Sequence, residues 1–185
     1  MKQLDKTFFI SAAIAVLTIG LSSFSSLTKK LTPPVSAYTI TFLGKEALNG
    51  NYQWTWSVVN PNPGNGSNGT LQNISHWSLP LCPTAEASIV SASYSYDNIN
   101  WNSVSINMDR DPSIRSCTSV DVLKFDVGTS GTAPLYCRIV FNQDFSVNPL
   151  AVSYIKTGGG LQGCNVYTYS GIGCNVLPPT GTRND

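Results

Sequence analysis

The feature that most constrains the fold of this chain is a strict alternation of apolar and polar residues in short segments. The clearest case is "YQWTWSVV", where Tyr52, Trp54, Trp56 and Val58 alternate with polar residues. Because successive side chains of a β-strand point to opposite faces, this pattern predicts a strand with one face in a core. No segment after residue 37 shows a sustained helical period.

Eight further segments carry strand signals, and turn residues separate them. They are "YTITFL", "HWSLPL", "ASIVSASYSY", "WNSVSINM", "SVDVLKF", "LYCRIVF", "LAVSYI" and "CNVYTY". Pro80 cannot donate a ladder hydrogen bond, so the segment around it is expected at a sheet edge. Together the segments predict an all-β fold, a single antiparallel β-sandwich or jelly-roll domain over residues 38–176, followed by a tail over 177–185.

A polar run from Asn60 to Thr70 separates two of these strands. It reads "NPNPGNGSNGT", and its Pro, Gly and Asn residues favour turns. Strong strand signals flank it closely, so it is expected to be a long surface loop of one domain and not a linker between domains. It is interpreted either as a solvated connection or as a binding loop.

The N-terminus indicates export. Lys2 and Lys6 precede the uncharged run "TFFISAAIAVLTIGLSS", and small residues follow at Ser23 and Ser25. This is the pattern of a secretory signal peptide, predicted over residues 1–26, with a leader or N-terminal extension over 27–37. An uncleaved membrane anchor is the alternative. The expected location is secreted or at the cell surface, with no membrane contact after signal cleavage.

Composition supports an extracellular protein and excludes one class of partner. Only 11% of the residues are charged, against about 25% in a typical globular protein. Without residues 1–37 the chain keeps seven Lys and Arg against nine Asp and Glu, a net charge near −2. No basic patch remains to follow a phosphate backbone, so nucleic acid is not an expected partner.

Five cysteines allow at most two disulfides in an oxidising compartment. In "LYCRIVF", Leu135, Cys137, Ile139 and Phe141 share one strand face, which predicts that Cys137 is a buried free thiol. The other four cysteines are then expected to be oxidised. The predicted pairs are Cys82–Cys117 and Cys164–Cys174.

Few residues in the chain could carry catalysis or hold a metal. His76 is the single histidine, no "GxSxG" motif accompanies it, and no catalytic residue is assigned. Asp109 and Asp111 lie two apart in "NMDRDPS" and are the candidate ligands for calcium, although a turn around Asp111-Pro112 is the simpler interpretation. No other cofactor is expected.

Aromatic and loop residues are the candidate contacts for a ligand. Tyr167 and Tyr169 share one face of "NVYTYS" and would form a stacking platform if that face were exposed. "SYDNINW" resembles the "SxDGxxW" hairpins of many secreted β modules, sugar-binding ones among them, and it ends in Trp101. Trp77 and the loop residues Asn65 and Asn68 complete the set of candidates.

The chain as a whole resembles a group of small secreted bacterial β-sandwich proteins of the Bacteroidetes type, for which no activity is established. The resemblance rests on "WTWSVVNPNPGNGSNGTLQNISHW", "YSYDNINW", "VLKFDVGTSGTAPLYCRIVFNQDF" and "GIGC", which span most of residues 38–176. It implies secretion and a β fold and transfers no catalytic residue.

The sequence therefore predicts a secreted or cell-surface module without catalysis, which serves binding or adhesion and has a polysaccharide or another extracellular surface as its partner. Two alternatives stay open at this point. One is a self-associating subunit of an extracellular polymer. The other is a small secreted hydrolase that uses Asp109, Asp111 or His76.

Overall fold

The computed structural model describes residues 38–67, 70–158 and 163–177. The predicted signal peptide and extension, Asn68, and residues 178–185 of the predicted tail lie outside this part of the chain. The strands are β1 (Thr39–Leu48), β2 (Asn51–Val59), β3 (Ile74–Leu79), β4 (Ile89–Ser95), β5 (Asn102–Val104), β6 (Met108–Asp109), β7 (Val122–Phe125), β8 (Leu135–Phe141), β9 (Phe145–Thr157) and β10 (Cys164–Val176).

Two short helical segments interrupt the strands, α1 (Pro83–Glu86) and the 3-10 turn η1 (Pro112–Ile114). Each is a single turn that begins at a proline. A single turn is too short to show a helical period in the sequence. Of the helices that the structure describes, none has the length and apolar character needed to span a membrane.

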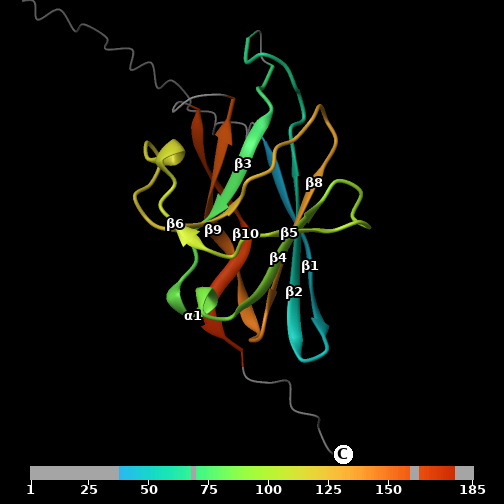
Figure 1. Ribbon diagram of the computed structural model, residues 1–185, viewed down its shortest axis with the longest axis vertical. Helices are drawn as coiled ribbons and strands as arrows, with labels where there is room; N and C mark the ends of the chain where they lie inside the picture. Colours follow the sequence, from blue (N-terminus) through green and yellow to red (C-terminus); the bar gives the residue numbers. More distant parts are fainter. Residues whose placement is uncertain (1–37, 68–69, 159–162, 178–185) are drawn as a thin grey trace, which may run out of the picture. The chain divides into compact units, whose positions relative to one another are not determined.

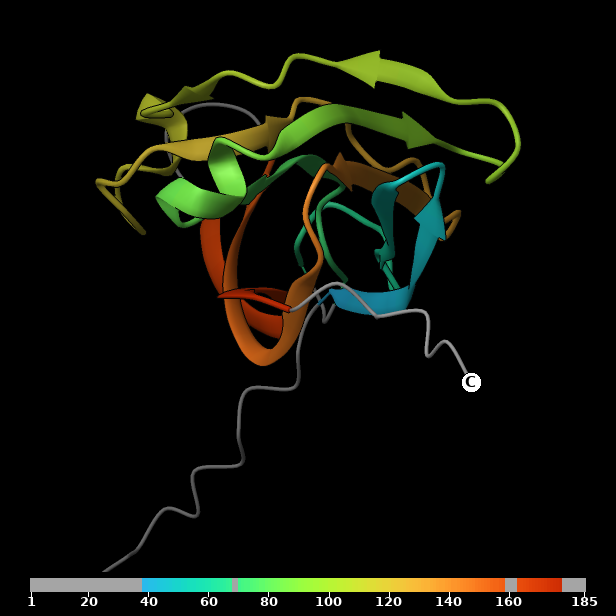
Figure 2. The ribbon, with the colours of Figure 1, turned by 90° about the horizontal axis from the view of Figure 1, so that it is seen from below.

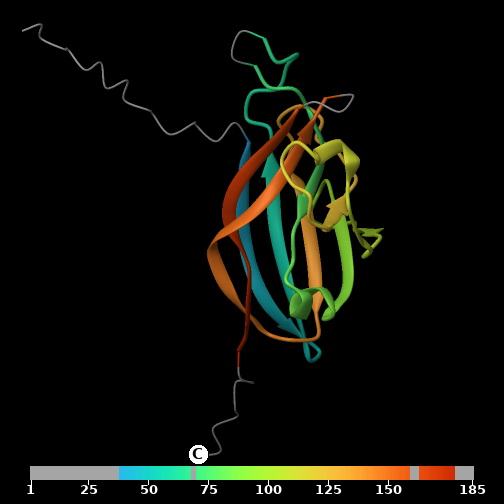
Figure 3. The same ribbon diagram turned by 90° about the vertical axis from the view of Figure 1, so that its left-hand side faces the viewer.

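The strands form two antiparallel five-stranded sheets (Figures 1 and 3). Sheet 1 has the order β1-β2-β8-β4-β5, and sheet 2 has the order β10-β9-β3-β7-β6. Seen from below, the two sheets enclose a common interior (Figure 2). The all-β sandwich predicted from the alternation is confirmed, and its strands run from Thr39 to Val176.

The alternation also predicts which side chains face the interior. On β2, Trp54, Trp56 and Val58 are fully buried, while Gln53 and Thr55 between them are partly exposed. On β8 the residues alternate between buried and half-buried from Leu135 to Phe141, and Cys137 is fully buried as a free thiol. These strand faces are confirmed, and they arise because burial of apolar area is the main driving force for folding.

Aromatic rings connect the two sheets across the core. Trp56 of sheet 1 lies 6.0 Å from Trp77 of sheet 2 between ring centroids, and Trp77 lies 5.6 Å from Phe125. Tyr169 packs edge-on against both tryptophans. Large rings in edge and offset contacts contribute more stability than their area alone.

Two strand predictions are wrong. The segment "WNSVSINM" is not one strand, because β5 belongs to sheet 1 and β6 to sheet 2. Pro80 does not mark an edge strand either. β3 lies in the interior of sheet 2 between β7 and β9, and it ends at Leu79, so Pro80 takes no ladder position.

The polar run from Asn60 to Thr70 is the connection that carries the chain from β2 in sheet 1 to β3 in sheet 2. Asn60 is fully buried, and its side-chain amide donates hydrogen bonds to the carbonyls of Leu71 and Gln72. The Gly64 amide donates to Leu71 and the Leu71 amide donates to Asn62. The loop is therefore a hydrogen-bonded connection within one domain, as expected.

The outer face of sheet 2 is covered by the chain segment between β6 and β7, which includes η1. Ile114, Val122 and Tyr154 form a second, small buried cluster there, with Cys117 and Cys164 packed against it. Cys117 and Cys164 form a disulfide with Cα atoms 6.1 Å apart. The predicted pairs Cys82–Cys117 and Cys164–Cys174 are therefore wrong. The physical reason is that η1 folds over β9 and brings Cys117 to Cys164, the first residue of β10.

Candidate functional site

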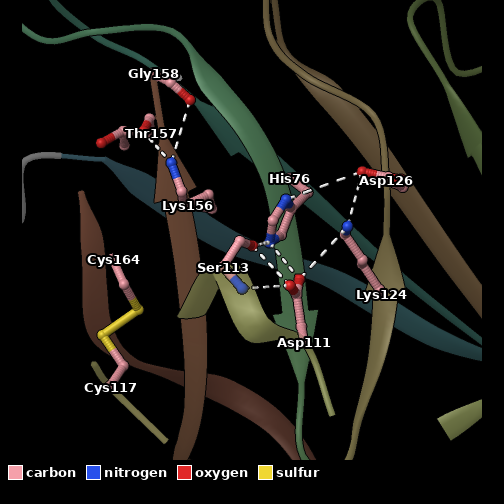
Figure 4. A network of polar contacts seen from close by, with 10 residues as sticks. All are labelled: His76, Asp111, Ser113, Cys117, Lys124, Asp126, Lys156, Thr157, Gly158 and Cys164. Carbon is pink, nitrogen blue, oxygen red and sulfur yellow. Dashed lines mark hydrogen bonds and ion pairs between the residues drawn. A yellow bond between two sulfur atoms is a disulfide. The ribbon is translucent and has the colours of Figure 1, made fainter. Parts of the chain in front are cut away.

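Each sheet of the sandwich carries a polar site on its outer face. The first is a cluster of His76 from β3, Asp111 and Ser113 at η1, and Lys124 and Asp126 at the end of β7 (Figure 4). We call it the His76 network. It lies under the η1 segment, on the outer face of sheet 2, because His76 points away from the core that its neighbour Trp77 enters.

Asp111 is the centre of the His76 network. Its Oδ2 lies 2.9 Å from His76 Nε2 and 3.4 Å from Lys124 Nζ. Its Oδ1 accepts hydrogen bonds from the Ser113 amide at 2.9 Å and the Ser113 hydroxyl at 2.7 Å, so Asp111 also caps η1. Lys124 Nζ reaches Asp126 Oδ1 at 3.1 Å, which closes the network toward solvent.

Burial decides the protonation of this network at neutral pH. His76 is only 2% exposed, and burial lowers the pKa of His76 to about 4. The charges of Lys124 and Lys156 act in the same direction, while Asp111 and Asp126 oppose them. Burial alone would raise the pKa of Asp111, but hydrogen bonds from Ser113 and the charges of His76 and Lys124 hold that pKa below its usual value.

The geometry of the His76 network does not activate a nucleophile. In a serine hydrolase the serine and the orienting carboxylate contact opposite nitrogens of the histidine. Here Asp111 Oδ2 and, at 3.5 Å, Ser113 Oγ both face Nε2, and Asp126 Oδ1 lies 3.9 Å from Nδ1, beyond hydrogen-bond distance. The Ser113 hydroxyl donates to Asp111 Oδ1 at 2.7 Å, so its proton is directed at that carboxylate and not at the His76 ring. The hydrolase interpretation gains no base from this cluster.

A hollow of about 310 Å³ adjoins the His76 network, and both predicted calcium ligands line it. Asp109 and Asp111 share this hollow with Arg110, Lys124 and Asp126. The Asp111 carboxylate contacts His76, Ser113 and Lys124. Among residues 38–67, 70–158 and 163–177, no group of three or more His, Cys, Asp or Glu side chains could hold a metal ion. Calcium binding stays a prediction.

The second site is a polar hollow of about 270 Å³ on the outer face of sheet 1, which we call the Arg138 hollow. Five polar side chains from four strands or turns converge on it, with Leu43 and Gly44 completing the wall: Glu46, Gln53, Thr55, Asn98 and Arg138. Thr55 of β2 and Arg138 of β8 are direct neighbours in the ladder, and Glu46 of β1 stands opposite Gln53. The strand register therefore positions the site.

Arg138 is held in place by an aromatic ring. Its guanidinium carbon lies 3.5 Å from the ring centroid of Trp101, a cation–π contact. Within the described part of the chain, no acceptor reaches its Nε, and no hydrogen bond or ion pair is formed by its guanidinium. Burial lowers the pKa of Arg138 and the Glu46 charge raises it, but a guanidinium stays charged at neutral pH.

The structure places the predicted aromatic platform inside the protein. Tyr167 and Tyr169 share a face as expected, but that face points to the core, where Tyr169 is 5% exposed. Burial raises the pKa of Tyr167 to about 12, and Tyr167 packs edge-on against Tyr38. Trp77 is fully buried. Trp77 and Tyr169 are therefore not available as a sugar-stacking surface, and Tyr167 is half-buried against the core.

Of the remaining predicted ligand residues, Trp101 and Asn65 are accessible. Trp101 is half-buried beside the Arg138 hollow. Asn65 is exposed, and its Oδ1 accepts a hydrogen bond from the Ser67 amide at 2.9 Å, which stabilises the loop turn. Asn68 lies outside the described residues.

The Arg138 hollow contains several residues that the sequence patterns did not single out. Gln53, Thr55 and Arg138 are the polar positions of "YQWTWSVV" and "LYCRIVF", on the face opposite the core. A polar face on two strands is a visible signal. It becomes a site only because β2 and β8 are neighbours, which the sequence order does not reveal.

We compared the chain with known proteins. No protein-family model, no curated protein and no solved structure matches the chain.

Proposed function

We propose that this protein is a non-catalytic binding module for an extracellular polysaccharide, and that the Arg138 hollow on sheet 1 is its binding site. The observation that carries the proposal is the position of the Arg138 side chain and its lack of hydrogen-bond partners among the described residues. The guanidinium is fixed against Trp101 at a polar hollow, and its hydrogen-bond donors are unoccupied within the described part of the chain.

The chemistry of the hollow fits hydroxyl groups. Each sugar hydroxyl both donates and accepts a hydrogen bond. Gln53 and Asn98 offer amide donors and acceptors, Thr55 a hydroxyl, Glu46 an acceptor and Arg138 donors. The hollow is open and contains little apolar surface, so it suits a chain of polar sugar rings better than a small apolar ligand.

The site is also rigid before any ligand arrives. Thr55, Gln53 and Arg138 lie on β2 and β8, two interior strands whose other faces are buried in the core. The Trp101 ring restricts the long Arg138 side chain. Side chains that are already ordered lose less conformational entropy on binding, so each hydrogen bond contributes more to affinity.

The test is a binding screen of the full chain against neutral and uronic-acid polysaccharides, with and without calcium. Affinity electrophoresis identifies the ligand and calorimetry measures its Kd. We expect Arg138→Ala to weaken binding about tenfold or more, because charge-assisted hydrogen bonds to the ligand are lost. Arg138→Lys should recover only part of it, since lysine lacks the planar group that stacks on Trp101.

Asp109→Asn is the matched control, because Asp109 is exposed in the other hollow on sheet 2. It should leave the affinity unchanged. The proposal is wrong if no polysaccharide binds, or if Arg138→Ala binds as well as the wild type. If only Asp109→Asn weakens a calcium-dependent interaction, the site lies on sheet 2.

A second candidate function, a subunit of an extracellular polymer, is favoured by one surface. The β9–β10 hairpin exposes several large apolar side chains at the edge of sheet 2. They are Val147, Leu150, Val152, Val166 and Val176. An apolar surface beside a sheet edge is a common site of protein association.

A further inference from the structure

Two cysteines outside the Cys117–Cys164 bridge meet near the end of β10. Cys82 is the residue that precedes α1, and Cys174 lies on β10, which α1 contacts (Figure 1). Their thiol groups are within hydrogen-bond reach of each other. Cys82 is half-buried and Cys174 is exposed, so Cys174 is the residue of the pair that a reagent meets first.

The backbone holds both residues in place. The Cys82 carbonyl accepts the first hydrogen bond of α1, from the Glu86 amide at 2.9 Å. At the end of β10, Val176 is paired with Phe145, and the Leu177 amide donates to the Asp144 carbonyl at 2.6 Å. These contacts fix the backbone at Cys82 and just after Cys174, the two positions that the bridge would join.

The other free thiol cannot compete for either partner. Cys137 is fully buried on β8, between its ladder neighbours Trp56 of β2 and Tyr94 of β4. Burial raises the pKa of Cys137 well above its usual value. A thiol without solvent access and without a thiolate form does not react with a disulfide reagent.

We propose that Cys82 and Cys174 form the second disulfide of this protein when it meets a small disulfide oxidant. The exposed Cys174 thiolate attacks the oxidant, forms a mixed disulfide and releases one thiol of the oxidant. The Cys82 thiolate then attacks the Cys174 sulfur and releases the second thiol. The two cysteines lose two electrons and two protons, and the oxidant is reduced to two thiols.

The bridge would fix β10 near both of its ends. Cys164 is the first residue of β10 and is already joined to Cys117, and Cys174 lies two residues before the last residue, Val176. β10 is the edge strand of sheet 2. A covalent link at each end opposes fraying of an edge strand, which is the least protected kind of strand.

The first test is disulfide mapping of the full chain after incubation with oxidised glutathione. The protein is denatured without reduction, alkylated, digested and analysed by mass spectrometry. We expect the Cys82 peptide linked to the Cys174 peptide, the Cys117 peptide linked to the Cys164 peptide, and label on Cys137 alone. Label on Cys82 and Cys174 after oxidation, or a Cys82–Cys117 link, would overturn the proposal.

The rate of bridging gives a second readout. The hydrogen bond with Cys82, together with burial, raises the pKa of Cys174 to about 11. Only a small fraction of Cys174 is therefore thiolate at pH 7. Bridge formation should become faster as the pH rises from 7 to 9, whereas a rate independent of pH would contradict attack by this thiolate.

Stability measurements separate this bridge from the other one. In a Cys117→Ala/Cys164→Ala background, oxidation should raise Tm by roughly 10 °C. Adding Cys82→Ser and Cys174→Ser to that background should abolish the redox-dependent shift. A shift that persists in the fourfold variant would contradict the proposal. If the background variant does not fold, the peptide mapping of the wild-type chain still decides.

Discussion

At the scale of single residues, the most informative side chain is His76. The only histidine of the chain is buried on β3, between β7 and β9, and its Nε2 lies 2.9 Å from Asp111 Oδ2, so its protonation follows from its surroundings and not from its titration in water. Lys156 is a parallel case. It is 2% exposed, and its ammonium donates to the carbonyls of Thr157 and Gly158.

The protein should lose stability as the pH falls from 6.5 toward 4. His76 has a folded-state pKa of about 4 against 6.5 when unfolded, so the unfolded chain binds a proton first in this window. Between pH 7 and pH 4.5 we expect a loss of about 2 kcal/mol in the free energy of unfolding, measured by urea denaturation. Lys124, Lys156, Asp111 and Asp126 all face the ring and are included in that pKa.

His76→Gln is the matched variant, since glutamine keeps an N–H donor and does not titrate. Its free energy of unfolding should change less over the same pH range. A variant with the same pH dependence as the wild type would show that another group is responsible.

At the scale of elements, the η1 segment depends on the sheet that it covers. It is a single turn of helix, too short to be stable alone, and it is held by Asp111, by the Ile114 cluster and by the Cys117–Cys164 bridge. The strands need no such support, because their apolar faces enter a shared core.

Loss of the Cys117–Cys164 bridge should therefore act mainly on the η1 segment. In a Cys82→Ser/Cys174→Ser background, adding Cys117→Ala and Cys164→Ala should lower the free energy of unfolding by about 2–4 kcal/mol, measured by chemical denaturation. Limited proteolysis should find new cleavage between residues 110 and 121. Cleavage that is unchanged would mean that packing alone holds the segment. With reducing agent present, both proteins should show similar stability.

At the scale of the whole molecule, the two outer faces of the sandwich differ. The sheet 1 face carries the polar Arg138 hollow, and the sheet 2 face is covered in part by η1 and exposes apolar residues along β9 and β10. This asymmetry separates the binding proposal from the polymer proposal, since each uses a different face.

If the β9–β10 surface mediates assembly, light scattering should show a mass that rises with concentration. Leu150 is 73% exposed and Val166 is 56% exposed, so Leu150→Glu and Val166→Glu should return the protein to a monomer without unfolding it. Thr39→Glu on the sheet 1 face is the control and should not change the mass. A wild-type protein that stays monomeric at all concentrations contradicts assembly through this surface.

The strands and their buried faces could be read from the chain because their cause is local. Alternation in "YQWTWSVV" and "LYCRIVF" depends on neighbours two residues apart, and a residue such as Cys137 inherits its burial from that period. The same period correctly grouped Tyr167 with Tyr169. It could not tell which side of the strand faces the core, and that choice removed the expected aromatic platform.

The disulfide partners and the candidate site were decided only by the tertiary arrangement. Cys117 reaches Cys164 because η1 folds across sheet 2, and Thr55 meets Arg138 because β8 inserts beside β2 and not beside β7 or β9. These contacts join residues far apart in the chain. Periodicity shows which face of its own strand a residue occupies. The order of the strands is set by how all the apolar faces pack together.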